Sequence, residues 1–419
     1  MARRYKINKT KTNKSGFLFI LLLLIILGIA TYAVVNYQFD IRKRAVGIPP
    51  VALIHKPVCP GPQKDKFRCH SRIIVDPFGN PKTAYIPDGY GPNQFRTAYT
   101  LSGTVSSPQT IALVSAFDQP NILADLNTYS RAFNIPTLRS CLVSSGTNKA
   151  PCFQKVDQNG GSVYPQFDQA WALETTLDVE VAHAICQNCN LLLVEANTNS
   201  YSDLLNAVDR ARLMGAHVIS NSYGSSEFVG ENSFDSHFNY TGLAIVYSSG
   251  DSGYGSSYPA GSQFVTAAGG TTLTINPDNS YNNEAVWSGT VSGCSLYEPK
   301  PSWQKDSFCT NRTIADISAD ADPNTGAAVY TSISYNGRKG WLKMGGTSLS
   351  APIIAGVFAL GGVPINGTAN SLVYTLGTSS NLHDITSGSN GSCGTALCNA
   401  ALGFDGPTGM GTPLGVKAF

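Results

Sequence analysis

The chain has 419 residues, of which 42% are hydrophobic and only 13% are charged, and its formal net charge is +2. This length allows one large domain or two ordinary ones, and the low charge excludes a disordered chain or a protein that coats nucleic acid. A composition rich in Gly, Ser, Thr, Asn and Tyr is typical of secreted, loop-rich enzymes.

The amino-terminal end predicts a membrane segment. Residues 1–15 form a basic tail, and residues 16–35 contain no charged side chain. A stretch of that length can cross a bilayer as a helix, with its positive flank in the cytoplasm. A cleaved signal peptide is the alternative, because Thr31 and Ala33 offer a small-residue cleavage site. The apolar run is longer than most signal-peptide cores, so we expect an uncleaved anchor with the rest of the chain outside the cytoplasm.

Residues 36–89 contain several prolines, the basic triplet 42–44 and few periodic apolar positions. They predict a stalk or a short pro-region. The composition changes at Tyr90, and residues 90–419 show no internal repeat and no linker-like stretch. We therefore expect one domain over residues 90–419.

Ten cysteines fall as near neighbours in the sequence, which favours five local disulfides in an oxidising compartment. The expected pairs are Cys59 with Cys69, Cys141 with Cys152, Cys186 with Cys189, Cys294 with Cys309, and Cys393 with Cys398. A redox or zinc motif at the Cys-x-x-Cys of residues 186–189 is the alternative. The chain has no second such motif and no clustered histidines, which argues against zinc.

Compact apolar runs alternate with helical patterns through the domain. Strands are expected at residues 110–118, 191–195, 217–222, 242–248 and 264–268, and helices at residues 121–133 and 202–214. This alternation predicts an α/β fold with a mostly parallel sheet covered on both faces. The active sites of such sheets lie at the carboxyl ends of the strands.

Residues 172–182 predict a helix that carries two acids. Leu173, Leu177 and Val181 form an apolar stripe, and the spacing of Glu174 and Asp178 places both carboxylates on one face. A solvated acidic edge is the ordinary interpretation. The flanking sequence is strongly apolar, however, and a partly dry carboxylate pair shares a proton and suits general-base chemistry in acid.

Residues 344–360 predict a tight glycine turn followed by a buried helix, with Ser348 at its start. An ordinary N-cap would explain a serine there. The longer pattern Gly-Thr-Ser-x-Ser-x-Pro resembles the nucleophile segment of the subtilisin-like serine peptidases and of their acid-active relatives, the sedolisins. None of the six histidines lies in the His-Gly-Thr context of the subtilisins. Glu174 and Asp178 on one helix, together with Ser348, resemble the sedolisin Glu-Asp-Ser triad.

This resemblance implies a subtilisin-like three-layer fold over residues 90–419, and residues 91–99 resemble the opening of the sedolisin catalytic domain. The segment 248–253 resembles the family's Ser-Gly-Asp-x-Gly motif, whose aspartate lines the oxyanion hole, and Asp251 occupies that place. Such an acid donates to an oxyanion only while protonated, so low pH should be needed. Residues 222–224 are expected to border the substrate cleft. Most sedolisins carry a long folded prosegment ahead of this domain, for which residues 36–89 leave no room.

Two carboxy-terminal segments, 383–388 and 402–413, resemble the two halves of the sedolisin calcium site. The resemblance implies one structural Ca²⁺ held by the side chains of Asp384 and Asp405 and by the carbonyls of Ile385, Ala401 and Gly403. Carboxylates and carbonyl oxygens are the ligands that Ca²⁺ prefers.

The resulting prediction is a monomeric, acid-active serine-carboxyl endopeptidase that acts on proteins or peptides and binds no nucleic acid. Glu174 is expected to accept the proton of Ser348, Asp178 to support Glu174, and Asp251 to stabilise the oxyanion. Three alternatives stay open. They are tripeptidyl-peptidase action, a catalytically silent membrane-tethered binding protein on the same scaffold, and a neutral serine peptidase that uses His183.

Overall fold

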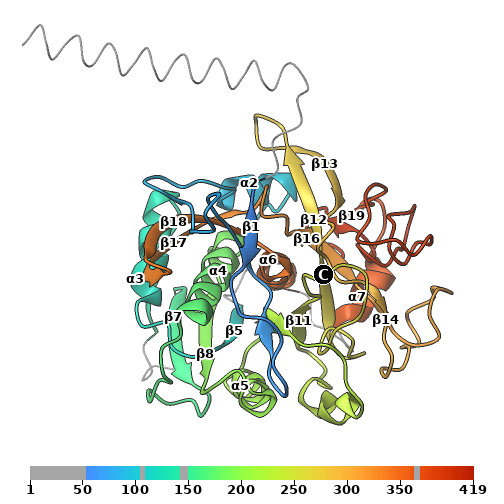
Figure 1. The fold of residues 1–419 in the computed structure, drawn as a ribbon, viewed down its shortest axis with the longest axis horizontal. Coiled ribbons are helices and arrows are strands. Elements are labelled where there is room, and N and C mark those ends of the chain that lie inside the picture. Colours follow the sequence, from blue (N-terminus) through green and yellow to red (C-terminus); the bar gives the residue numbers. More distant parts are fainter. Residues whose placement is uncertain (1–52, 104–108, 142–149, 363–368) are drawn as a thin grey trace, which may run out of the picture. The chain divides into compact units, whose positions relative to one another are not determined.

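A parallel sheet forms the centre of the computed structural model, which describes residues 53–103, 109–141, 150–362 and 369–419. Nine strands of the described chain join in the order β13-β12-β11-β9-β5-β8-β7-β6, with β16 also paired to β12 (Figure 1). Every pairing in this sheet is parallel except that of β12 with β13. The strands are β5 (Thr110–Ala116), β6 (Arg139–Ser140), β7 (Cys152–Asp157), β8 (Asn190–Ala196), β9 (Val218–Asn221), β11 (Ala244–Ser248), β12 (Thr266–Ile275), β13 (Tyr281–Val286) and β16 (Ile317–Asp320).

The sequence of the central strands explains the parallel arrangement. In β5 and β8 every residue after the first is buried, as expected for strands covered on both faces. Each strand expected from the apolar runs is present, with bounds that differ by at most two residues except that β12 continues seven residues beyond its predicted end. The predicted mostly parallel sheet is therefore confirmed.

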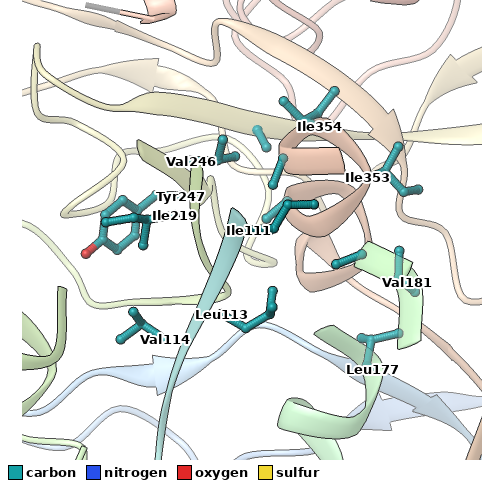
Figure 2. Close-up of a cluster of buried hydrophobic side chains, with 14 of the residues drawn as sticks. Ile111, Leu113, Val114, Leu177, Val181, Ile219, Val246, Tyr247, Ile353 and Ile354 are labelled. Carbon is teal, nitrogen blue, oxygen red and sulfur yellow. The ribbon is translucent and has the colours of Figure 1, made fainter. Parts of the chain in front are cut away.

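Helices lie on both sides of the sheet (Figure 1). Helix α4 (Gln169–Ile185) packs against α6 (Thr347–Gly361), and α6 crosses β9, β11, β12 and β16, while α5 (Tyr201–Leu213) contacts β5, β8 and β9. Figure 2 shows this core, in which side chains of β5, β9 and β11 meet those of α4 and α6. The remaining helices are α2 (Pro92–Ala98), α3 (Ile122–Ala132), α7 (Ala369–Leu376) and the 3₁₀ helix η1 (Glu231–His237).

Gly356 sets the distance between α4 and α6. A Cβ atom there would lie 2.5 Å from Cγ2 of Ile185, so only glycine allows the two helices to approach this closely. The contact brings the amino-terminal end of α6, which carries Ser348, alongside the acids of α4.

A second, antiparallel sheet contains the chain's early residues. Its order is β1-β3-β18-β17, with β4 also paired to β18, and the separate strand β2 pairs with β10. The strands are β1 (His55–Pro57), β2 (Arg68–Cys69), β3 (Arg72–Ile74), β4 (Thr83–Ala84), β10 (Tyr223–Gly224), β17 (Ala327–Tyr335) and β18 (Arg338–Gly345).

The stalk or short pro-region expected over residues 36–89 lies partly within the described residues. From Leu53 onward the segment belongs to the same compact unit as the catalytic domain, whereas residues 36–52 lie outside the described residues. Its strands are two or three residues long and so leave no periodic pattern in the sequence. Their positions depend on the partner strands β10 and β18.

All five predicted disulfides are present. Cys186 and Cys189 are bonded to each other, so they hold no zinc. The last two short sheets pair β14 (Gly293–Cys294) with β15 (Thr313–Ile314), and β19 (Leu382–His383) with β20 (Thr412–Pro413). Within the described residues no helix has both the length and the apolar character needed to span a membrane. The segment predicted to do so, residues 16–35, lies outside them.

Candidate active site

The acid pair lies on α4, a helix that the fold buries almost completely. Asp168 caps its start by accepting hydrogen bonds from the backbone amides of Ala170 (2.9 Å) and Trp171 (3.0 Å). Glu174 and Asp178 are each only 1% exposed. The solvated acidic edge is therefore excluded.

Burial dominates the electrostatics of this pair. It raises the pKa of Glu174 above its usual value, although the neighbouring hydroxyls of Ser348 and Ser71 partly oppose the shift. These hydroxyls are near Glu174, yet in the described chain no hydrogen bond of ordinary geometry reaches either carboxylate oxygen. Burial, and then the charge of Glu174, raises the pKa of Asp178 well above its usual value. Two acids this close and this dry retain a proton between them.

Ser348 stands in the first turn of α6, directly after the turn at Gly346. The turn requires glycine, because its φ is +94° and a Cβ atom there would lie 2.0 Å from the carbonyl oxygen of His70. The Ser348 hydroxyl donates to the carbonyl oxygen of Ser222 at 3.3 Å. Backbone amides of a first helical turn have no partner within the helix, so the Ser348 amide is available to an anion.

Ser222 joins the nucleophile helix to the acid pair. Its hydroxyl donates to Oδ1 of Asp178 at 2.6 Å and lies 3.5 Å from the carbonyl oxygen of Ser348. Pro352, one turn after Ser348, has no N–H to bond this carbonyl. The Ser348 carbonyl oxygen therefore has no helical hydrogen bond from residue 352 and contacts Ser222, whose hydroxyl donates to Asp178.

Asp251 follows β11 and lies at the start of α6. Its Oδ1 accepts hydrogen bonds from the Thr347 amide at 2.8 Å and the Thr347 hydroxyl at 3.0 Å. Burial raises the pKa of Asp251 to about 6, although Thr347, Arg72 and Arg68 oppose the shift. The carboxyl group is therefore mostly protonated in acid and mostly ionised at neutral pH.

The structure brings together all four residues named from the sequence as catalytic. It also adds His70 and Ser71, which the sequence reasoning missed, and it gives Ser222, expected only to border the substrate cleft, a hydrogen bond to Asp178. His70 lies in a cavity of about 190 Å³ that is also lined by Arg68, Gly250 and Asp251. In the sequence, His70 is marked only by following a disulfide-bonded cysteine. The strand before it, Arg68–Cys69, has two residues and so no recognisable pattern.

Neither nearby histidine is placed as a base for Ser348. His183, the candidate for a neutral peptidase, is buried and contacts the carbonyl oxygen of Pro136 through Nε2 at 2.7 Å. His70 contacts the Ser248 hydroxyl through Nδ1 at 2.8 Å. Burial and the charge of Arg68 lower the pKa of His70 to about 3, so this histidine is a very weak base.

The loops expected to hold calcium meet beside the β19–β20 pair. The Asp384 carboxylate accepts from the Gly403 amide at 2.9 Å, and Asp405 accepts from the Ala401 amide at 2.9 Å. Burial, with a contribution from the charge of Asp384, raises the pKa of Asp405 to about 7. No described lysine or arginine forms an ion pair with either acid, and no group of three or more metal-ligating side chains occurs in the described ranges. Two uncompensated carboxylates among loop carbonyls fit Ca²⁺, because carbonyl oxygens complete its ligand set.

Comparisons with known proteins identify relatives of this chain. The model of the subtilase family matches residues 175–361. Sedolisin from Pseudomonas sp. (strain 101) is 28% identical over 82% of this chain and 63% of its own length. Xanthomonalisin from Xanthomonas sp. (strain T-22) is 34% identical over 38% of this chain and 21% of its own. The chain thus spans less than two thirds of the length of either relative.

Among solved structures, Pseudomonas sedolisin, a serine-carboxyl proteinase complexed with two molecules of pseudo-iodotyrostatin, is similar to this chain with a TM-score of 0.64. The two are 28% identical, and the match covers 78% of this chain and 96% of that one. The shared fold therefore includes nearly the whole of that solved chain.

Proposed function

Since the chain belongs to the sedolisin family of serine-type peptidases, we propose that it is an acid-active serine-carboxyl endopeptidase with Ser348 as nucleophile. One observation carries the proposal. The buried acid pair and Ser348 are linked through Ser222, and the protonatable Asp251 contacts Thr347, the residue before Ser348.

In the proposed mechanism, Ser348 Oγ attacks the carbonyl carbon of the scissile peptide while Glu174 accepts its proton. Asp178, held by the Ser222 hydroxyl, keeps the pair's remaining proton and orients Glu174. Protonated Asp251 and the Ser348 amide donate to the developing oxyanion. Glu174 then protonates the leaving amine, and a water molecule releases the acyl group by the reverse sequence.

The two ends of the cleft favour endopeptidase action over tripeptidyl-peptidase action. The protein's own chain runs along β10 as β2 and along β18 as β3, and it continues beyond both pairings. A cleft that is open at both ends would accept the interior of a long peptide, as an endopeptidase requires. The natural substrates are proposed to be unfolded proteins or peptides.

A calcium ion is proposed at the Asp384–Asp405 loops, held also by the carbonyls of Ile385, Ala401 and Gly403. When bound, it would neutralise the two carboxylates and join loops that follow β19 and precede β20. Its role is structural, since none of its proposed ligands is a residue of the proposed mechanism.

The chain is further proposed to act as a monomer outside the cytoplasm, anchored through residues 16–35. That segment carries the sequence signal for a bilayer span. Release by signal-peptide cleavage is the alternative.

The first test is hydrolysis of an unfolded protein across a series from about pH 3 to about pH 8, comparing wild type with Ser348→Ala and Glu174→Gln. Activity should be confined to acid, because ionised Asp251 would repel the oxyanion at higher pH. Each substitution should lower kcat by about 10⁴-fold or more.

Glu180→Gln provides a matched control. Glu180 lies on the same helix and is equally buried, with a raised pKa, but its carboxylate accepts from the Tyr330 amide at 2.9 Å and not from the site. This variant should keep its activity. Wild type that is inert at every pH would support a silent scaffold. A profile rising toward neutral pH would support a histidine base.

A further inference from the structure

Exposed apolar side chains gather at one end of the antiparallel sheet. Phe78, Tyr85 and Ile86 are each at least 73% exposed. Single apolar side chains are common on protein surfaces, but several that gather in one place mark a contact site. This end of the sheet is therefore a candidate interaction surface.

The strand order explains why these three side chains lie at the same end. The chain leaves β3, turns back through residues 76–80 and returns as β4, so Phe78 lies at the tip of that turn. β4 pairs with β18 in antiparallel register. Tyr85 and Ile86 follow β4 directly and therefore continue toward the hairpin that joins β17 to β18.

Basic side chains surround the apolar ones. Hydrogen bonds from Asn80, together with the charge of Arg338, lower the pKa of Asp76 in the turn, so Arg338 lies close to the turn that carries Phe78. Arg338 and its neighbour are exposed in the β17–β18 hairpin, and a lysine is exposed just before β4. The apolar and basic side chains together are named here the basic-apolar patch, which consists of Phe78, Lys82, Tyr85, Ile86, Arg338 and Lys339.

The charge of this end of the sheet differs from that of the rest of the domain. Residues 1–52 hold nine of the 29 basic side chains and one of the 27 acidic ones, so residues 53–419 have a formal net charge of −6. In residues 54–56, 75–88 and 336–343, basic side chains nonetheless outnumber acidic ones by five to two. A positive and apolar area on a negative domain fits an anionic partner surface.

The chain enters the described domain beside this patch. The carbonyl oxygen of Ile54, a residue that is itself 55% exposed, accepts a hydrogen bond from the Val75 amide at 2.9 Å. Lys56 donates to the carbonyl oxygen of Gly79 at 2.6 Å. Residues 36–52, named here the tether, connect the predicted bilayer span to this point, and a segment of that length extends at most about 60 Å. The patch thus lies at the point of the domain to which the tether is joined.

We propose that the basic-apolar patch docks onto the membrane that holds residues 16–35, with its apolar side chains in the headgroup region and its cations on anionic phospholipid headgroups. This inference rests on the anchoring proposed above. Aromatic side chains favour the bilayer interface. Each basic side chain near an anionic bilayer strengthens binding by about fivefold, so the cations of the patch add to the effect of its apolar side chains.

β18 connects the patch to the candidate active site. It runs from Arg338, in the patch, to Gly345, directly before the turn that leads to Ser348. A strand of this length spans about 23 Å. Docking would therefore hold Ser348 near the lipid surface, where it would meet protein segments close to the membrane, without taking part in the chemistry.

The test uses full-length Ser348→Ala with a recognition site for an unrelated endopeptidase inserted between residues 45 and 52. The protein is reconstituted into vesicles of phosphatidylcholine alone, or of equal parts phosphatidylcholine and phosphatidylglycerol. The endopeptidase then cuts the tether, and sedimentation shows whether the domain stays on the vesicles. We expect it to stay on the anionic vesicles, to leave the neutral ones, and to be retained less as salt is added.

Variants of the patch test which side chains hold the domain. Arg338→Gln combined with Lys339→Gln should weaken retention by about 25-fold, and Phe78→Ser should weaken it as well. Lys305→Gln and Val163→Ser change exposed side chains outside the patch. These two matched controls should be retained like the parent protein.

Hydrolysis of a soluble peptide in acid, measured with Ser348 intact, separates this inference from the proposed function. The patch variants should hydrolyse the peptide at the wild-type rate. If they do, but the cut domain leaves anionic vesicles or is retained equally on both lipids, the docking inference fails and the proposed peptidase stands. If the domain is retained as expected while wild type is inert toward the peptide, docking stands and the peptidase assignment fails.

Two further outcomes would overturn the docking inference. A full-length chain that does not enter vesicles before the tether is cut contradicts the anchoring on which docking depends. If the patch substitutions instead convert a dimer in solution to a monomer, the patch binds a second copy of the chain and not the membrane.

Discussion

At the scale of single residues, Asp251 decides the working pH of the proposed enzyme. Its carboxyl group must donate a hydrogen bond, and it can do so only below its pKa of about 6. Burial raises that pKa, and Arg68 and Arg72 partly oppose the shift. The enzyme should therefore lose activity as the pH rises through about 6.

Asp251→Asn tests this assignment. The amide oxygen can still accept from Thr347, and the amide group remains a neutral donor at every pH. We expect reduced kcat in acid but no loss between about pH 5 and about pH 8, where wild type declines. Asp251→Ala should lower kcat by about 10²–10³-fold, the cost of one oxyanion donor.

The measurement is kcat/KM against pH for each protein. If the kcat/KM of Asp251→Asn declines with rising pH as that of wild type does, the decline reflects ionisation of the Glu174–Asp178 pair and not of Asp251.

At the scale of elements, the loops beside β19 and β20 show how a metal would stabilise the fold. Asp405 is fully buried, and its pKa is raised to about 7 by burial and by Asp384. Because its folded pKa lies above its unfolded value, the protonated form favours folding, and that stability is lost as pH rises from about 4 to about 7. Bound Ca²⁺ would offset the loss.

Chelation should therefore lower Tm at about pH 7 and have little effect at about pH 4, measured on Ser348→Ala to prevent self-digestion. Free calcium at about 100 times its Kd should add about 2.7 kcal/mol to the free energy of unfolding. Asp405→Asn should remove the calcium response. Glu231→Gln, which alters a buried acid elsewhere, should keep it, and a response retained in Asp405→Asn would place the metal at another site.

At the scale of the whole molecule, buried acids make the protein suited to low pH. Burial raises the pKa of Glu195 and Glu231 to about 8, that of Glu284 to about 7 and that of Glu298 to about 9. In the unfolded chain these groups ionise near pH 4 to 5. Stability is thus fully present below that range and declines as pH rises through the folded values.

The Tm of Ser348→Ala, measured with calcium held constant, should be higher at about pH 4 than at about pH 8. Glu298→Gln should raise Tm at the higher pH and leave it unchanged at the lower, because Glu298 is buried and is opposed by the charges of Asp235 and Glu231. Asp278→Asn, at an exposed turn, should not reproduce this gain. A Tm that rises toward neutral pH would contradict the prediction.

The sequence alone determined the features that depend on near neighbours. Continuous apolar runs identify the parallel strands, because a strand covered on both faces needs no alternation. Glu174 and Asp178 share a helix face through their i, i+4 spacing, and the five disulfides join cysteines no more than 15 residues apart.

Only the tertiary structure decided how the active site is filled. His70 meets Ser222 and Gly346 across more than 150 residues of chain, and the strand that precedes it has two residues, too few for any pattern. The close approach of Gly356 to Ile185, which sets Ser348 beside Glu174, is likewise a contact between distant helices. Such contacts depend on the packing of the whole core, which local spacing does not encode.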